Sequence, residues 1–257
     1  MLELKNISFA AEGKEILKDV SLRIEDRFVA ITGPNGSGKS TLLSVLAGVS
    51  ACIKGSFLCG GKDLLRDTKE RSRIVGYVPQ SIPLLEELTA KDNLSLWYDR
   101  KTLKRELETG MLQVLGISDF LNVPVSKMSG GMKKRLSIGC AIADDPKILL
   151  LDEPLGALDL QLRRQMQIEL KRLQKQLGIT FIYITHDQEE ALNMSDRIAV
   201  LHQGVFQQLG TPSEVYNTPK NAYVARFVGS ANILCGTAAF RDGIWILEYG
   251  GSAVPID

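Results

Sequence analysis

A glycine-rich octapeptide at residues 33–40 constrains the fold of this chain more than any other feature. It reads GPNGSGKS and satisfies the P-loop pattern G-x-x-x-x-G-K-[ST], which carries meaning only between a strand and a helix. The apolar run 28–31 predicts the strand. Leu42, Leu43 and Leu46 recur at helical spacing before a glycine and predict a helix over 39–47. We therefore predict an α/β fold in which a parallel sheet carries a P-loop.

Each residue type in this loop has a physical reason to be there. Glycines let successive backbone N–H groups face an anion at the start of the helix, where the helix dipole also favours negative charge. Lys39 can reach the β- and γ-phosphates of a nucleotide, and the Ser40 hydroxyl can ligate Mg²⁺. The predicted nucleotide-binding residues of the loop are Gly33, Pro34, Asn35, Gly36, Ser37, Gly38, Lys39, Ser40 and Thr41.

Two carboxylates follow a second predicted strand, the apolar run 148–151. They are Asp152 and Glu153. A carboxylate at the end of such a strand reaches the magnesium beside the phosphates, so Asp152 is the predicted metal ligand. Glu153 points elsewhere and can orient or deprotonate an attacking water. Taken alone, the two acids are also compatible with a solvated turn.

The composition excludes several classes of protein. Of 257 residues, 44% are hydrophobic and 24% charged, which predicts one main globular domain with a subdomain or tail rather than a disordered chain. A net charge of +1 gives no basic footprint for nucleic acid, so we expect no nucleic-acid partner. Four cysteines without CxxC spacing predict a reduced, intracellular protein. No leader-like N-terminus and no uncharged apolar window of about 18 residues is found, so we expect any membrane role to come through a partner.

A βαβ unit is predicted over residues 148–185. Short apolar runs at 148–151 and 180–185 predict strands, and the charged, periodic segment 160–177 predicts a helix that ends at Gly178. Because parallel strands need such a crossover, this order predicts neighbouring parallel strands in one sheet.

The middle of the chain, about residues 81–145, changes to helical character. Leu103, Leu107 and Met111 recur at four-residue intervals, as on one face of a helix. Helix start and stop signals are found at Thr89, Asp92 and Gly116. We therefore predict an inserted helical subdomain.

Local signals also divide the C-terminal third. Asp187 with Glu190 and Thr211 with Glu214 have the three-residue spacing of capping boxes and predict helix starts. Residues 202–204 predict a turn between two short strands. The last stretch has short β-like runs but too little length for a core of its own.

Four further short motifs occur in a characteristic order. Residues 128–132 read MSGGM, close to LSGGQ, residues 77–80 end in Gln80, residues 156–159 end in Asp159, and residues 185–187 contain His186. With the P-loop and the acidic pair, these motifs resemble those of the ABC ATPase family over residues 1–228. The resemblance implies a P-loop NTPase parallel-sheet core, an antiparallel β subdomain and the inserted helical subdomain. It also implies that residues 229–257 are a short tail, the truncated start of a β-barrel-like regulatory domain.

The resemblance also implies roles for individual residues. Gln80 would sense the metal and couple to membrane subunits, His186 would contact the γ-phosphate, and Glu153 would be the catalytic carboxylate. The motif residues Ser129, Gly130 and Gly131 would serve the nucleotide site of an opposite subunit, and Asp159 would be a further nucleotide-binding residue. The family's signature motif is matched here by residues 128–132. Since the chain has one P-loop and one signature motif, a complete site needs a second copy, and we expect an ATP-dependent dimer. The implied cofactors are ATP and Mg²⁺, with Ser40, Gln80 and Asp152 on the metal.

Two positions depart from the family pattern. The family places an aromatic residue beside the adenine, but the aligned position here is Ala11, and Phe9 is the nearest aromatic candidate. Met132 replaces the usual glutamine of the signature, which removes one polar contact and leaves the Ser-Gly-Gly donors. We expect activity to survive both changes.

The second half of the chain is most similar to import ATPases of the spermidine/putrescine type. That similarity implies transmembrane permease subunits, an extracytoplasmic solute-binding protein, and a place at the cytoplasmic face of the membrane. The first half resembles other branches, including some exporters. Two alternatives remain open at this point: a degenerate cassette that binds nucleotide without turnover, and a mechanical ATPase acting on DNA or the ribosome. The second predicts a long coiled-coil insertion or two cassettes, and neither is evident in the sequence.

Overall fold

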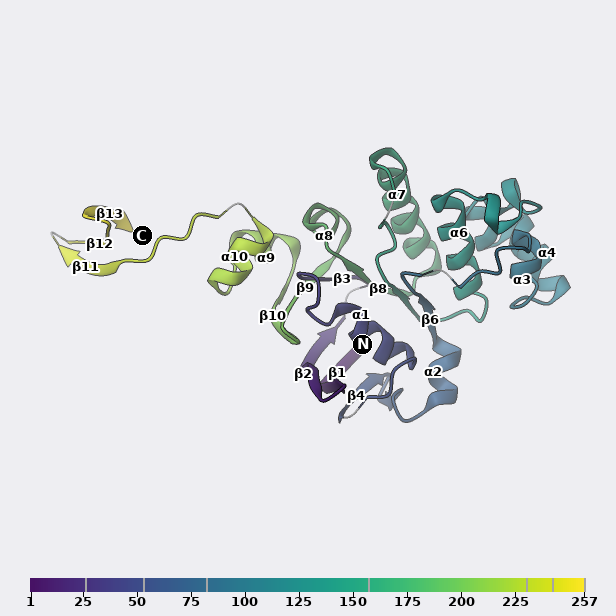
Figure 1. The fold of residues 1–257 in the computed structure, drawn as a ribbon, viewed down its shortest axis with the longest axis horizontal. Helices are drawn as coiled ribbons and strands as arrows, with labels where there is room; N and C mark the ends of the chain where they lie inside the picture. The colour runs from purple at the N-terminus through teal and green to yellow at the C-terminus, as the bar shows by residue number, and fades with distance from the viewer. Residues whose placement is uncertain are drawn as a thin grey trace.

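A six-stranded sheet forms the centre of the structure, a computed structural model that describes residues 1–25, 27–52, 54–81, 83–156, 158–229, 231–241 and 243–256. The strand order is β10-β9-β3-β8-β7-β6; the five strands from β9 to β6 are parallel, and β10 is antiparallel to β9 (Figure 1). The strands are β3 (Phe28–Thr32), β6 (Val75–Val78), β7 (Ile148–Leu151), β8 (Thr180–Thr185), β9 (Arg197–His202) and β10 (Val205–Gly210). The predicted parallel βαβ unit and the turn at 202–204 are thereby confirmed.

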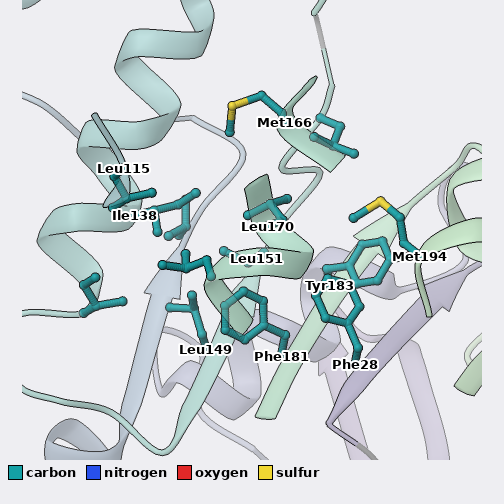
Figure 2. Packing of buried hydrophobic residues seen from close by; sticks show 14 of the residues in the cluster. Phe28, Leu115, Ile138, Leu149, Leu151, Met166, Leu170, Phe181, Tyr183 and Met194 are labelled. Atoms are coloured by element: carbon teal, nitrogen blue, oxygen red, sulfur yellow. The ribbon is translucent and has the colours of Figure 1, made fainter. Parts of the chain in front are cut away.

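Strands β3 and β7 are buried along their whole length, because the sheet is covered on both faces. Alternate residues of β7 point to opposite sides: Leu149 and Leu151 join one hydrophobic cluster, and Leu150 joins another. In the first cluster, Phe28 stacks on Phe181 with ring centroids 5.4 Å apart. Figure 2 shows these rings and leucines beneath Met166 and Leu170 of helix α7 (Leu160–Leu177). The two clusters hold the strand ends that carry the polar residues in fixed positions.

The second cluster lies between the central sheet and a four-stranded antiparallel sheet of order β2-β1-β4-β5. Helix α1 (Lys39–Ala47) supplies Leu42 and Leu46 to this cluster, and its end at the left-handed Gly48 confirms the predicted helix. The strands are β1 (Leu2–Ala11), β2 (Lys14–Ile24), β4 (Lys54–Cys59) and β5 (Lys62–Asp63), and α2 (Thr68–Ile74) leads from them to β6. This sheet is the antiparallel β element that the family resemblance implies.

The segment between β6 and β7 is helical among its described residues. Its elements are α3 (Ala90–Leu94), α4 (Arg100–Thr109), α5 (Met111–Val114), the 3₁₀ turns η1 (Ile117–Phe120) and η2 (Val125–Lys127), and α6 (Gly130–Ala141). Thr89 and Asp92 form the capping box of α3. The predicted apolar stripe of Leu103, Leu107 and Met111 does not lie on one helix, because α4 ends at Thr109 and Met111 begins α5. The Glu106 carboxylate accepts a hydrogen bond of 2.9 Å from the Met111 N–H at this break.

The remaining helices follow the central strands. They are α8 (Gln188–Met194), α9 (Pro212–Asn217) and α10 (Ala222–Val228). Thr211 and Glu214 form the predicted capping box of α9. The box predicted at Asp187 is only half formed: Asp187 accepts from the Glu190 N–H, but the Glu190 side chain turns inward to Thr185. Within the described residues, no helix combines the length and the apolar character needed to cross a membrane.

The C-terminal strands β11 (Thr237–Arg241), β12 (Ile244–Tyr249) and β13 (Ser252–Ile256) form a separate antiparallel sheet that projects away from the rest (Figure 1). Ile246 is buried, whereas Phe240 and Trp245 are more than half exposed. Three strands without a covering layer bury too little apolar area to form a core. The tail therefore stands as an appendage beside the main body.

Candidate functional site

A cavity of about 800 Å³ opens at the P-loop, where the central sheet meets the antiparallel sheet. One wall consists of P-loop residues, a second of strand β2, and a third of polar side chains from four separate parts of the chain. The lining residues are Lys14, Glu15, Ile16, Lys18, Asn35, Gly36, Gly38, Lys39, Ser40, Thr41, Gln80, Glu153, His186 and Gln203. A cavity of this size accommodates a nucleotide-sized ligand.

The P-loop follows β3 directly and is fixed by close backbone contacts. Gly38 caps α1 with φ of 102°, a left-handed conformation that favours glycine. At Gly33, a side-chain Cβ would overlap the carbonyl oxygen of Leu201 in β9. Both positions therefore require glycine, which explains the glycine spacing of the motif.

The β9–β10 turn holds the loop from the other side, a contact that the sequence did not reveal. The Gly204 N–H donates to the Ser37 carbonyl (3.0 Å), and the Gly204 carbonyl accepts from the Lys18 N–H of β2 (2.9 Å). Gly204 itself is left-handed, with φ of 78°. The turn at residues 202–204 was predicted, but its contact with the P-loop joins residues 167 positions apart and depends on the sheet order.

Lys39 is folded back onto its own loop. Its Nζ donates to the carbonyl oxygens of Gly33 (2.8 Å) and Pro34 (2.9 Å), and the residue is 6% exposed. Burial lowers the pKa of the amine, while the nearby charges of Glu153 and Asp152 oppose that shift. A buried cation held by two carbonyl oxygens can exchange these partners for phosphate oxygens, which are the stronger acceptors.

Two hydroxyls of the loop, one buried and one exposed, test whether it fits a phosphate and a metal. Ser37 is 3% exposed, and its Oγ has no hydrogen-bond partner among the described residues, so the loop leaves a donor for an anion. Ser40 Oγ donates to Asp152 Oδ1 at 3.1 Å. Asp152 is buried, and that burial raises the pKa of its carboxyl group. A hydroxyl and a buried carboxylate oxygen in contact are the hard donors that Mg²⁺ prefers.

Glu153, Gln80 and His186 meet at one edge of the central sheet. Glu153 Oε2 accepts from Gln80 Nε2 at 3.0 Å, and Glu153 Oε1 lies 3.2 Å from His186 Nδ1. Neighbouring parallel strands end at the same edge, and these residues follow β6, β7 and β8. Glu153 has φ of 46°, a conformation that is strained for glutamate. The strand ends thus direct one carboxylate, held by two polar groups, into the cavity.

The residues of the MSGGM motif (128–132) and Asp159 lie away from this cavity. Ser129 caps α6 by accepting the Met132 N–H (3.3 Å), and Asp159 caps α7 by accepting the Leu162 N–H (2.9 Å). Neither lines the cavity, and Ser129 and Gly130 are exposed whereas Gly131 is buried. Ala157, in the same motif as Asp159, lies outside the described residues. The structure of one chain thus brings the P-loop, Gln80, Asp152, Glu153 and His186 together and leaves the signature facing outward.

The prediction that Phe9 lies beside the base is not supported by the structure. The sequence made it the nearest aromatic candidate for the base, but its half-buried side chain packs against the second hydrophobic cluster and does not line the cavity. Ala11 is exposed at the end of β1 and pairs with Lys14 of β2. The residues of strand β2 that line the cavity, Lys14 and Ile16 among them, were not predicted from the sequence.

Comparisons with known proteins agree with this geometry. A family model described as ABC transporter matches residues 17–156. The spermidine/putrescine import ATP-binding protein PotA of Clostridium novyi is 43% identical over 97% of this chain and 71% of its own length; that of Spiroplasma citri is 42% identical over 100% of this chain and 74% of its own. Among solved structures, the ATP-binding cassette MJ0796, in a dimeric post-hydrolysis state bound to ADP and Pi, is similar with a TM-score of 0.70 and 29% identity. That similarity covers 82% of this chain and 99% of the other.

Proposed function

This chain belongs to the ABC transporter family of ATP-binding proteins, and from that membership we propose that it powers the import of the polyamines spermidine and putrescine. It is an ABC-type ATPase. The observation that carries the catalytic part of the proposal is the Glu153 carboxylate, which projects into the P-loop cavity between Gln80 and His186. A cassette without turnover would not need a strained glutamate held at this place.

The reaction follows from the groups around the cavity. Lys39 and the backbone N–H groups of the P-loop bind the phosphates of ATP, and Glu153 orients a water molecule toward the γ-phosphorus. As the oxygen of that water bonds to phosphorus, the bond to the β–γ bridging oxygen breaks, and Glu153 accepts the proton. The products are ADP and inorganic phosphate. His186 donates to the γ-phosphate oxygens, on which negative charge accumulates.

Ser40 and Asp152 would hold Mg²⁺, and Gln80 would reach it once its contact with Glu153 opens. A bound Mg²⁺ supplies charge neutralisation at the β- and γ-phosphate oxygens. The hydroxyl and the carboxylate already touch each other, so the site needs little rearrangement to receive a cation. This preorganisation supports the assignment of Asp152, rather than Glu153, as the metal-side acid.

The nucleotide site is completed by a second copy of the chain. Ser129 and Gly130 are exposed at the start of α6, a helix of 12 residues, and the helix dipole there favours a phosphate. Because these residues do not line the cavity of their own chain, they serve the nucleotide bound by the opposite copy. The dimeric state of the similar cassette supports this arrangement.

The transported substrate and the partners follow from the relatives. Eight relatives between 41% and 43% identical, covering 92–100% of this chain, are all spermidine/putrescine import ATP-binding proteins. Each match spans both halves of the chain, including the first half, whose motifs resemble those of other branches of the family. The proposed partners are transmembrane permease subunits and an extracytoplasmic solute-binding protein, with the chain at the cytoplasmic face of the membrane.

Transport tests the polyamine assignment. The chain is reconstituted with its permease subunits in liposomes, with ATP on the side of the chain and radiolabelled spermidine with the solute-binding protein on the other. We expect spermidine to accumulate only with ATP and to raise ATP hydrolysis several-fold, and unlabelled putrescine to compete. Glycine betaine and maltose are controls that should not compete. ATP-dependent uptake of either control without uptake of polyamine would refute the polyamine assignment and leave the ATPase assignment standing.

A further inference from the structure

Arg163, in the first turn of α7, joins two loops that border the nucleotide cavity. Its Nη2 donates to the Leu158 carbonyl (3.2 Å), and its Nη1 donates to Asp187 Oδ2 (3.2 Å). Leu158 directly precedes Asp159, and Asp187 directly follows His186. A planar guanidinium can span two acceptors in this way, whereas a lysine ammonium is a single point of contact.

A buried carboxylate extends the cluster to the other side of His186. Glu190 Oε1 lies 3.7 Å from Arg163 Nε, and the Glu190 side chain is 6% exposed. Its Oε2 accepts from Thr185 Oγ1 at 2.5 Å. Thr185 Oγ1 in turn accepts from the Asp187 N–H at 3.0 Å. The residues immediately before and after His186 are therefore both tied to the same partly buried ionic cluster.

The His186 ring itself has little packing to hold it. Its side chain is 58% exposed, and its described hydrogen bond is the 3.2 Å contact with Glu153. Arg163 does not line the nucleotide cavity and, among the described residues, bonds to neither Glu153 nor His186. It faces them across a second space of about 40 Å³, with Glu190 beside it. The backbone on either side of the ring must therefore fix where the ring lies.

We propose that Arg163 is a positioning residue for ATP hydrolysis: its guanidinium holds the His186 loop against Glu153 by tying it to the loop that carries Leu158. The proposal rests on the proposed function, because it deepens the role of the same site. A displacement of about 1 Å at a reacting group can cost about 10²-fold in rate.

Kinetics of variants give the first test. Arg163→Ala should lower kcat about 10- to 100-fold and leave the KM for ATP within about two-fold, because the side chain does not line the cavity. Arg163→Lys should recover part of the lost kcat, since lysine keeps the positive charge but can make only one of the two contacts of the guanidinium. Arg164→Ala, at the exposed next residue of α7, is the matched control and should keep the wild-type kcat. A wild-type kcat in Arg163→Ala would overturn the proposal.

A double-mutant cycle separates positioning from general stabilisation of the fold. If Arg163 acts through His186, adding Arg163→Ala to His186→Ala should lower kcat by less than about three-fold. An equal fractional loss in both backgrounds, together with a lowered melting temperature, would show a merely structural role and contradict the proposal.

A turnover-independent measurement keeps this test separate from the proposed function. The chain has two histidines, so the His186 ring resonance can be assigned by NMR with a His202→Gln variant. Glu153→Gln should shift the His186 resonance in the wild-type background and shift it much less beside Arg163→Ala, because the ring is then no longer held at the carboxylate. An equal shift in both backgrounds would overturn the positioning role. Absence of ATP hydrolysis in the wild-type chain would instead refute the catalytic assignment and leave the NMR result readable.

Discussion

Replacing Glu153 with glutamine is expected to lower the rate of ATP hydrolysis about 10²- to 10⁴-fold, the usual cost of losing a general base. The amide keeps the size of the side chain and can still accept from Gln80 at the position of Oε2. It cannot accept the proton of the attacking water. Removing a negative charge beside Asp152 also lessens repulsion of the phosphates, so nucleotide binding should persist. The measurement is phosphate release at saturating ATP and Mg²⁺.

The same variant should accumulate as an ATP-bound dimer, because a closed dimer that cannot hydrolyse its nucleotide does not reopen. Size-exclusion chromatography with and without ATP measures this directly. Glu108→Gln, which alters an exposed carboxylate of α4, is the control and should hydrolyse ATP at the wild-type rate. Wild-type turnover in Glu153→Gln would assign the base to another residue.

Lys39→Ala is expected to weaken ATP binding about ten- to hundred-fold and to lower turnover further. A hydrogen bond to a charged group contributes about 1.5–3 kcal/mol, which corresponds to that range of affinity. The amine is buried at the P-loop and bonded to two loop carbonyls, so it is placed where phosphates bind. Nucleotide affinity by isothermal titration, and hydrolysis at saturating ATP, measure the two effects.

Thermal unfolding distinguishes lost binding from lost folding in this variant. Burial already disfavours the charged form of Lys39, as the lowered pKa of its amine indicates, so its removal should change the melting temperature of the nucleotide-free protein little. The rise in melting temperature on adding ATP should disappear. Lys101→Ala, at an exposed position of α4, should retain that rise. A retained ATP-induced rise in Lys39→Ala would contradict the assigned role.

Local signals made much of this fold predictable. The helix over 39–47 ends where Gly48 adopts a left-handed conformation, and the apolar runs at 148–151 and 180–185 became buried parallel strands. These signals act within a few residues, so they survive in any tertiary context. The sequence left open whether Asp152 and Glu153 form only a solvated turn. In the structure Asp152 contacts Ser40 and Glu153 contacts His186, which a solvated turn would not require.

Features that depend on register or on distant parts of the chain could not be predicted. Strand β1 has irregular pairing with β2 on either side of Phe9, and such shifts change the face on which a residue lies. The sequence does not mark them, so Phe9 was wrongly placed beside the base. Glu190 had the spacing of a capping residue, but its carboxylate accepts a buried hydrogen bond from the Thr185 hydroxyl instead. The contact of Gly204 with the P-loop likewise needed the strand order.

In the proposed mechanism, two copies of the chain share each ATP site. The most direct test is the specific rate of Mg²⁺-dependent ATP hydrolysis, per chain, over a range of protein concentrations in which sedimentation reports the oligomeric state. We expect a specific rate that rises with concentration and levels off as the dimer fraction saturates. A specific rate that stays constant down to dilutions at which the chain sediments as a monomer would contradict it.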